Sequence, residues 1–125
     1  MARIILIDDN EPLRRALQRV LERGGHQVQA AEDGKQGLRL FEEHGADLVI
    51  TDLVMPNAEG IETIRELVRL SPGLKILAIS GGVPGTSLDM LAIAEKLGAT
   101  STMRKPVATE ALLTRIAELL DPPPA

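Results

Sequence analysis

Three short, unbroken apolar runs constrain the fold of this chain most strongly. They are Ile4-Ile5-Leu6-Ile7, Leu48-Val49-Ile50 and Ile76-Leu77-Ala78-Ile79. Runs of leucine and β-branched residues without polar alternation are typical of strands that are covered on both faces, as in a parallel sheet. Weaker strand patterns occupy residues 27–30 and 100–103. The sequence therefore predicts a parallel sheet of five strands.

Amphipathic segments with helical spacing separate these runs and follow the last one. Apolar residues recur on one helical face over residues 13–21, 35–43, 61–68, 88–97 and 107–120, and glycine or proline comes after each segment. Both residue types are common where helices end. Strands that alternate with helices predict an α/β domain with helices on both faces of the sheet. Right-handed crossovers then restrict the chain to a few doubly wound topologies.

The length and composition indicate one domain with an aliphatic core. A chain of 125 residues suits a single domain, and hydrophobic residues make up 44% of it, which is enough for independent folding. Phe41 is the only aromatic residue, so the core must be built from aliphatic side chains. We predict one domain over residues 1–121 and a proline-rich tail over residues 122–125, since consecutive prolines cannot extend a helix.

Composition also narrows the location and the partners. The chain has no cysteine, which excludes disulfides and thiolate metal sites and fits the reducing cytoplasm. No apolar run approaches the roughly 20 residues that span a bilayer, and the N-terminus lacks the layout of a signal peptide. A net charge of −4 argues against direct nucleic-acid binding. We expect a cytoplasmic monomer or weak dimer that binds neither membranes nor nucleic acids.

Polar side chains stand where the predicted strands end. Asp8 and Asp9 follow the first strand, Asp52 follows the third, Ser80 follows the fourth, and Lys105 comes shortly after the fifth. The carboxyl ends of parallel strands share one edge of the sheet, where open α/β folds bind their ligands. Residues that are far apart in the sequence should therefore meet at this edge.

The chemistry of these residue types points to phosphoryl transfer. Three clustered carboxylates would repel one another, and Mg²⁺ relieves this conflict because it prefers oxygen ligands. Lys105 would add a fixed positive charge, and one carboxylate would be free to act as a nucleophile. Phosphoryl transfer needs mainly positioning and charge neutralisation, which a metal ion and a lysine supply. Ser80 would donate its hydroxyl to the attached phosphoryl group.

Each of these residues also has an ordinary structural interpretation. Asp9 or Asn10 would serve as the cap of the first helix, and Asp52 would cap a turn. Ser80 would be a loop residue, and Lys105 a solvated surface charge. Taken one at a time, these interpretations are the stronger ones. Their joint occurrence at four strand ends favours a shared site.

Five sequence strings carry a resemblance to a known family. They are Ile5-Leu6-Ile7-Asp8-Asp9-Asn10-Glu11, Asp47-Leu48-Val49-Ile50-Thr51-Asp52-Leu53-Val54-Met55-Pro56, Lys75-Ile76-Leu77-Ala78-Ile79-Ser80-Gly81, Gly98-Ala99 and Lys105-Pro106. In their order and spacing, the chain resembles the receiver domain of bacterial response regulators over nearly its whole length. The resemblance implies a flavodoxin-like, doubly wound parallel sheet in the order 2-1-3-4-5 with five helices. It also implies a cis peptide bond between Lys105 and Pro106.

The resemblance assigns a role to each polar residue at the strand ends. Asp52 would be the phosphoacceptor, Ser80 the switch hydroxyl and Lys105 the amine that pairs with the phosphate. Mg²⁺ would be bound by four groups, namely Asp8, Asp9, Asp52 and the backbone carbonyl of Val54.

The resemblance also implies a function and partners. The domain would accept a phosphoryl group from a sensor histidine kinase or a histidine phosphotransfer protein. The surface of the fourth helix, fifth strand and fifth helix would then shift and alter binding of a downstream protein, or the phosphate would be relayed. This makes the protein a signalling switch rather than an enzyme, although it assists its own phosphorylation and dephosphorylation. We expect no output domain after the tail, which departs from the family pattern, and we expect the output to pass through a partner protein or a relay.

Within the domain, the sequence departs from the family pattern in two places. Thr102 stands three positions before Lys105, where the family often has an aromatic switch residue. Residues 81–86 form a long glycine-rich connection after the fourth strand. Conformational rearrangement around Ser80 is the favoured role of this segment. A phosphate cradle is disfavoured, because the spacing of a nucleotide-binding P-loop is absent.

Two other functions remain open on the sequence alone. A phosphatase of the haloacid dehalogenase-like class would use Asp8 as its nucleophile with Asn10 two residues on, but the chain has no room for a cap domain. A degenerate receiver would act only as a docking module, which the filled key positions disfavour. His26 and His44 are interpreted as surface residues near helix ends rather than as metal ligands or phosphoacceptors.

Overall fold

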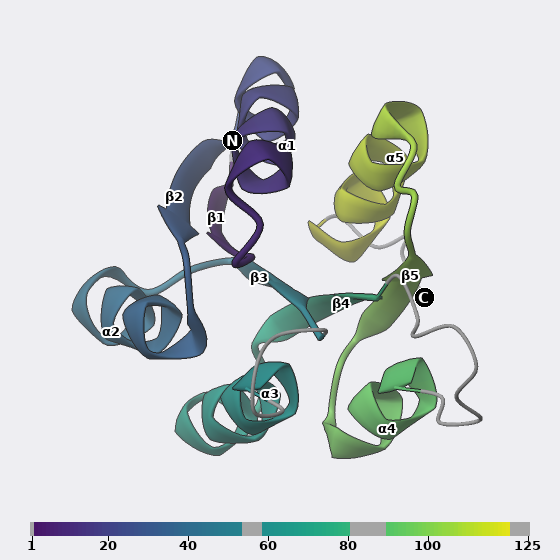
Figure 1. Cartoon of the computed structure of the whole chain (residues 1–125). Coiled ribbons are helices and arrows are strands. Elements are labelled where there is room, and N and C mark those ends of the chain that lie inside the picture. The colour runs from purple at the N-terminus through teal and green to yellow at the C-terminus, as the bar shows by residue number, and fades with distance from the viewer. Residues whose placement is uncertain (1, 54–58, 81–89, 121–125) are drawn as a thin grey trace.

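Five parallel strands form one sheet in the order β2-β1-β3-β4-β5, as the resemblance implied (Figure 1). The structure is a computed structural model that describes residues 2–53, 59–80 and 90–120. Along the chain the elements are β1 (Arg3–Ile7), α1 (Glu11–Arg23), β2 (Gln27–Ala31), α2 (Gly34–His44), β3 (Leu48–Asp52), α3 (Glu59–Leu70), β4 (Lys75–Ser80), α4 (Met90–Leu97), β5 (Ser101–Arg104) and α5 (Thr109–Leu120).

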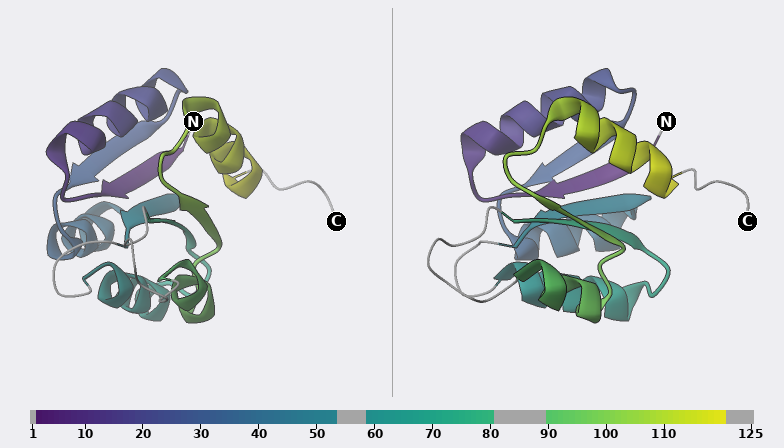
Figure 2. Two further views of the ribbon diagram at one scale, coloured as in Figure 1. Left: turned by 45° about the vertical axis from the view of Figure 1, so that its right-hand side comes forward. Right: turned by 90° about the vertical axis from the view of Figure 1, so that its right-hand side faces the viewer.

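Helices cover both faces of the sheet. Figure 1 shows α1 and α5 on one face and α2, α3 and α4 on the other, and the views in Figure 2 agree. The strand order reverses at β1, because the chain goes from β1 to β2 on one side and then returns to pair β3 on the other. In doubly wound folds the ligand crevice lies at such a switch point, beyond the carboxyl ends of the strands. The fold therefore marks the ends of β1 and β3 as the place to look for a site.

Two apolar layers explain why the sequences of β1, β3 and β4 contain unbroken apolar runs. Ile5 and Ile7 pack on the face of α2, α3 and α4, whereas Ile4 and Leu6 pack on the face of α1 and α5. Alternate side chains of a strand point to opposite faces, so a strand with helices on both sides has no face for polar residues. At about 25 cal/mol per Å² of buried apolar area, these layers provide the main stabilisation of the fold.

The element boundaries match the sequence predictions with small differences. The fifth helix begins at Thr109 rather than Val107, because the carbonyl of Ala108 accepts the first helical hydrogen bond, from the Leu112 backbone N–H. The last strand covers residues 101–104 instead of 100–103. Part of the predicted fourth helix, including Leu88, lies outside the described residues.

Two further predictions concern the C-terminal tail and membrane-spanning segments. The predicted tail at residues 122–125 lies outside the described residues, so the domain boundary at residue 121 stays a prediction. Among the residues that the structure describes, no helix combines the length and the apolar character needed to cross a membrane.

Candidate functional site

Three acidic side chains meet at the carboxyl edge of the sheet. Asp8 and Asp9 follow β1, and Asp52 ends β3, so the parallel pairing of these two strands brings them together. One carboxylate oxygen from each residue lies within 4.8 Å of the others. Asp8 and Asp52 are buried, whereas Asp9 is exposed. The predicted convergence of these three residues is therefore observed.

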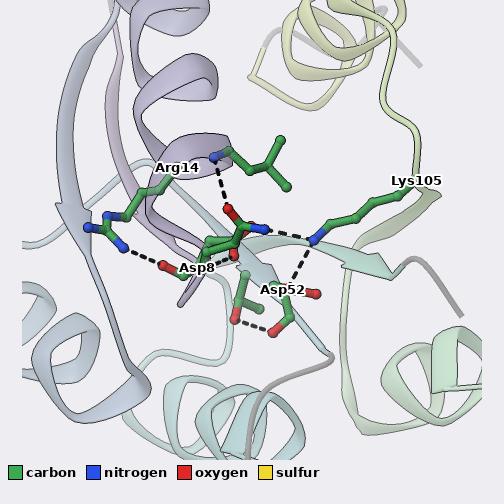
Figure 3. A network of polar contacts seen from close by, with 7 residues as sticks. Asp8, Arg14, Asp52 and Lys105 are labelled. Atoms are coloured by element: carbon green, nitrogen blue, oxygen red, sulfur yellow. Dashed lines mark hydrogen bonds and ion pairs between the residues drawn. The ribbon is translucent and has the colours of Figure 1, made fainter. Parts of the chain in front are cut away.

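Lys105 reaches into this acidic cluster from the segment that follows β5 (Figure 3). Its ammonium Nζ lies 3.0 Å from Oδ2 of Asp52 and 3.6 Å from Oδ2 of Asp8. The Lys105 side chain is only 23% exposed, so it is not the solvated surface charge of the ordinary interpretation. The Lys105–Pro106 peptide bond is cis, as the resemblance implied.

Burial and the neighbouring acidic groups change the titration of Asp8. Burial raises the pKa of the Asp8 carboxyl above its ordinary value of 3.8, and the neighbouring charges of Asp52 and Asp9 raise it further. The Asn10 backbone N–H and the Lys105 ammonium oppose this rise, because both stabilise the ionised form. The net rise means that these two contacts do not fully offset the burial of the Asp8 carboxylate and the repulsion from its neighbours.

A network of hydrogen bonds shapes the short loop that bears Asp8 and Asp9. The Asp8 carboxylate accepts from the Asn10 backbone N–H at 2.9 Å, and Asn10 also caps α1 by accepting from the Leu13 N–H at 3.1 Å. The ordinary interpretation of Asn10 as a helix cap is thus confirmed. The Arg14 guanidinium donates to the Asp8 backbone carbonyl at 2.9 Å. Arg14 was not among the predicted site residues, because nothing in the sequence pattern tells where this side chain points.

Close backbone packing fixes the position of Asp52. Its carbonyl accepts a hydrogen bond from the Thr51 hydroxyl at 3.2 Å. A Cβ atom at Gly60, in the first turn of α3, would lie 2.5 Å from that same carbonyl oxygen. Only glycine therefore allows α3 to start so close to Asp52. Gly60 was not among the predicted site residues either, although a glycine at the start of an amphipathic segment is a visible signal in the sequence.

Ser80 lies beside this cluster at the end of β4. The register pairs Asp52 with Ile79, the residue before Ser80. Ser80 is buried, and its backbone carbonyl accepts from the Lys105 N–H at 3.0 Å. The backbone of Ser80 thus connects β4 to the start of the Lys105 segment. Val54 and the glycine-rich residues 81–86 lie outside the described residues, so both predictions for them stay untested.

The donor set fits a hard divalent cation. Mg²⁺ takes carboxylate oxygens and water in octahedral geometry, and clustered carboxylates in a partly buried site favour it over softer metals. The raised pKa of Asp8 reflects burial of its carboxyl first and the charges of Asp52 and Asp9 after it, and both make the ionised form unfavourable. A bound divalent cation would remove that conflict, because it stabilises the ionised carboxylates.

Comparison with known proteins decides the family. A model of the response regulator receiver domain matches residues 4–117. The chain belongs to this family. Receiver domains are phosphorylation-dependent switches of two-component signalling, and they typically bind Mg²⁺ at an acidic pocket.

Individual relatives of this receiver domain agree with the assignment. It is 33% identical over 118 residues to response regulator MprA of Mycolicibacterium vanbaalenii. The aligned region covers 94% of this chain and 50% of MprA. The receiver domain protein of Clostridium thermocellum matches with a TM-score of 0.87 at 32% identity, covering 97% of this chain and 95% of that one. A CheY-like receiver domain protein of Methanospirillum hungatei gives a TM-score of 0.88 at 30% identity over 97% and 94% of the two chains. The chain spans half the length of the regulator MprA.

Polar contacts surround the position where receivers often have an aromatic switch residue. The Thr102 hydroxyl donates to Oε1 of Glu95 on α4 at 3.1 Å. On the other side of β5, Nη1 of Arg115 donates to the Ser101 hydroxyl at 2.6 Å and to the Thr102 backbone carbonyl at 2.9 Å. In this receiver, β5 is therefore joined to α4 and to α5 by hydrogen bonds.

The two histidines of this receiver lie apart from the acidic cluster. His44 is exposed at the end of α2, as predicted. His26 precedes β2 and is half-buried, and its Nδ1 atom is shielded from solvent and has no hydrogen-bond partner among the described residues. The prediction of a surface position is therefore only partly correct for His26.

Proposed function

We propose that Asp52 of this receiver domain accepts the phosphoryl group of a histidine-phosphorylated partner. The observation that carries the proposal is the contact of the Lys105 ammonium with Asp52 at 3.0 Å, inside a cluster that also holds Asp8 and Asp9. This arrangement supplies a carboxylate nucleophile, a fixed cation and further carboxylates for a metal ion. These are the parts that transfer of a phosphoryl group to a carboxylate requires.

The acidic residues would hold Mg²⁺. Its ligands would be the carboxylates of Asp8, Asp9 and Asp52 together with the backbone carbonyl of Val54, which comes from the family resemblance. When bound, the cation supplies neutralisation of the negative charge on the phosphoryl oxygens.

In the transfer itself, one O–P bond forms and one P–N bond breaks. A carboxylate oxygen of Asp52 attacks the phosphorus of phosphohistidine, so a new O–P bond forms while the P–N bond breaks. The electron pair of that bond stays on the imidazole, which takes up a proton from water. Lys105 then pairs with a phosphoryl oxygen of the acyl phosphate, and the Ser80 hydroxyl donates to another.

Partners and output follow from this chemistry. The phosphodonor is a sensor histidine kinase or a histidine phosphotransfer protein, since both present phosphohistidine. Added negative charge at Asp52 recruits Ser80 and Lys105, and the movement of Lys105 and Ser80 changes the surface of α4, β5 and α5. A downstream protein reads this surface, or the phosphate passes on. The domain is thus a switch that assists its own phosphorylation and dephosphorylation, not a metabolic enzyme.

One observation supports Asp52 over Asp8 as the nucleophile, against the phosphatase alternative. The Lys105 ammonium is closer to Asp52 than to Asp8, at 3.0 Å against 3.6 Å. A phosphoryl group on Asp52 would therefore be closer to its neutralising cation.

Intact-mass analysis tests the proposal directly. The wild type and the Asp52→Asn, Asp8→Asn and Asp47→Asn variants are incubated with acetyl phosphate, with and without Mg²⁺. We expect a single phosphoryl adduct that requires Mg²⁺, is lost in Asp52→Asn and remains in Asp47→Asn, which changes an exposed carboxylate outside the cluster. No adduct on folded wild type would instead support the docking module. Turnover of a phosphate ester that Asp8→Asn abolishes and Asp52→Asn does not would support the phosphatase.

A further inference from the structure

We infer that Arg14 is a positioning residue for the loop of residues 8–10, which joins β1 to α1 and bears Asp8 and Asp9. The inference rests on the proposed function, in which these two residues bind the metal ion. Arg14 lies in the first turn of α1, and its side chain turns back toward the end of β1 (Figure 3). There Nη1 donates to the backbone carbonyl of Asp8 at 2.9 Å. The guanidinium is partly buried, so this hydrogen bond is less exposed to competition from water than a surface contact.

The loop between β1 and α1 is closed at both ends by hydrogen bonds. At its start, the Asp8 N–H donates to the Ala31 carbonyl of β2 at 3.1 Å. At its end, the Arg14 N–H donates to the Asn10 carbonyl at 2.8 Å, which is the first hydrogen bond of α1. The Arg14 side chain adds a second connection from the same helical turn back to Asp8. Arg14 therefore joins the start of the loop to its end.

The Asp8 carbonyl is a critical place for such a connection. It belongs to the peptide unit that leads into Asp9, so its orientation is one of the factors that set the direction in which the Asp9 side chain leaves the backbone. Asp9 is exposed, yet its carboxylate lies within 4.8 Å of those of Asp8 and Asp52, and the three must stay close together to share a cation. A fixed peptide plane removes one of the motions that would separate these ligands.

Arg14 acts on the backbone rather than through its charge. Lys105 is the cation that lowers the pKa of Asp8, and it contacts the carboxylate. Arg14 contacts the Asp8 main chain and approaches it from the side away from Lys105 (Figure 3). A variant that lacks the Arg14 hydrogen bond should therefore lose metal affinity because the ligand geometry loosens, not because a charge is missing.

The experiment compares Arg14→Met with Arg15→Met by titration with Mn²⁺. Mn²⁺ takes the same oxygen ligands as Mg²⁺, and its electron paramagnetic resonance signal reports the free ion, so binding is measured without any phosphorylation. Arg15 is the matched control, because it is exposed and pairs with Glu11 on the surface of α1. We expect about tenfold weaker Mn²⁺ affinity for Arg14→Met, the lower end of what outer-shell residues contribute. Arg15→Met should keep the wild-type affinity.

Each outcome bears on a separate claim. Wild-type affinity in folded Arg14→Met would overturn the inference and leave the proposed function intact. An equal loss in Arg15→Met would also overturn it, since charge alone would then explain the effect. If the wild type binds no Mn²⁺, the metal site of the proposed function fails first and the inference fails with it. Should Arg14→Met not fold, as judged by circular dichroism, Arg14→Lys replaces it. Wild-type affinity in that variant would count against the role, because a lysine amine does not reproduce the planar guanidinium.

Discussion

Removal of the Lys105 ammonium should destabilise the metal-free protein strongly, although Lys105 is not part of the apolar core. The perturbation is Lys105→Met, which keeps an unbranched side chain and removes the positive charge. In the wild type, Nζ of Lys105 lies 3.0 Å from a carboxylate oxygen of Asp52 and 3.6 Å from one of Asp8. Both carboxylates are buried and would be left facing each other and Asp9.

The magnitude follows from these two distances. At an effective dielectric constant of about 20, unit charges at such separations attract by roughly 5 kcal/mol per pair. The net loss is smaller, because the variant no longer has to desolvate an ammonium group. Removal of one partner from a buried ion pair costs about 3–5 kcal/mol. The Lys105 side chain is 23% exposed, so solvent screens part of the interaction, and we expect a loss of about 3 kcal/mol.

Urea denaturation in the presence of a chelator measures this loss. The chain has no tryptophan or tyrosine, so far-UV circular dichroism is the suitable signal rather than intrinsic fluorescence. Lys35→Met serves as the control, because Lys35 is an exposed residue of α2. Its free energy of unfolding should stay within about 0.5 kcal/mol of the wild type. Addition of Mg²⁺ should restore much of the stability of Lys105→Met, because the cation compensates the same carboxylates.

The same change in an Asp8→Asn background provides a second check. With one of the two carboxylates gone, Lys105→Met should cost about half as much as in the wild type, since the two attractions are of similar size. A Lys105→Met protein as stable as the wild type in chelator would refute the reasoning. So would an equal loss in both backgrounds, because Asp8 and Lys105 would then be uncoupled.

The site and its surroundings support three further predictions. Because the pKa of Asp8 is raised in the folded state, protonation of Asp8 stabilises the folded protein. This contribution is fully present below pH 3.8, the ordinary pKa of the group, and is lost as pH rises through the pKa of Asp8 in the folded state. In chelator, Asp8→Asn should thus be more stable than the wild type at neutral pH, and thermal melts should show this advantage disappearing as pH falls. Gly60→Ala would place a Cβ atom 2.5 Å from the Asp52 carbonyl oxygen. The variant should therefore lose about 2 kcal/mol of unfolding free energy in urea denaturation and be phosphorylated more slowly by acetyl phosphate, and unchanged kinetics would contradict this. Thr102→Val removes the hydrogen bond to Glu95 and should lower the free energy of unfolding by about 1 kcal/mol. In a double-mutant cycle, Glu95→Ala should cause no comparable further loss in the Thr102→Val background.

Local patterns were enough to predict the elements of the fold. The apolar run at residues 4–7 predicted a strand covered on both faces, and its side chains indeed divide between two apolar layers. Helix boundaries were less certain, because their ends depend on single caps. The fifth helix starts at Thr109 because Ala108 is its cap, and nothing in the sequence distinguished that position from Val107.

The sequence by itself also determined which residues meet at the site. In a parallel sheet, strand ends share one edge, so Asp8, Asp9 and Asp52 were expected at the same edge. Their meeting in one cluster also requires β1 to lie beside β3. The ligand roles and the phosphoacceptor role came from the family resemblance and await the phosphorylation experiment. The resemblance also supplied the strand order, which physical patterning alone had left among several topologies.

Only the tertiary structure decided how the site is supported. The contact of Arg14 with the Asp8 carbonyl depends on the path of a long side chain, and the need for Gly60 depends on how closely α3 approaches Asp52. The raised pKa of Asp8 likewise depends on burial and on the distances to neighbouring charges. A linear sequence encodes these features only through packing between distant segments. Periodicity reports which face of an element is buried, but it carries no information about what that face will contact.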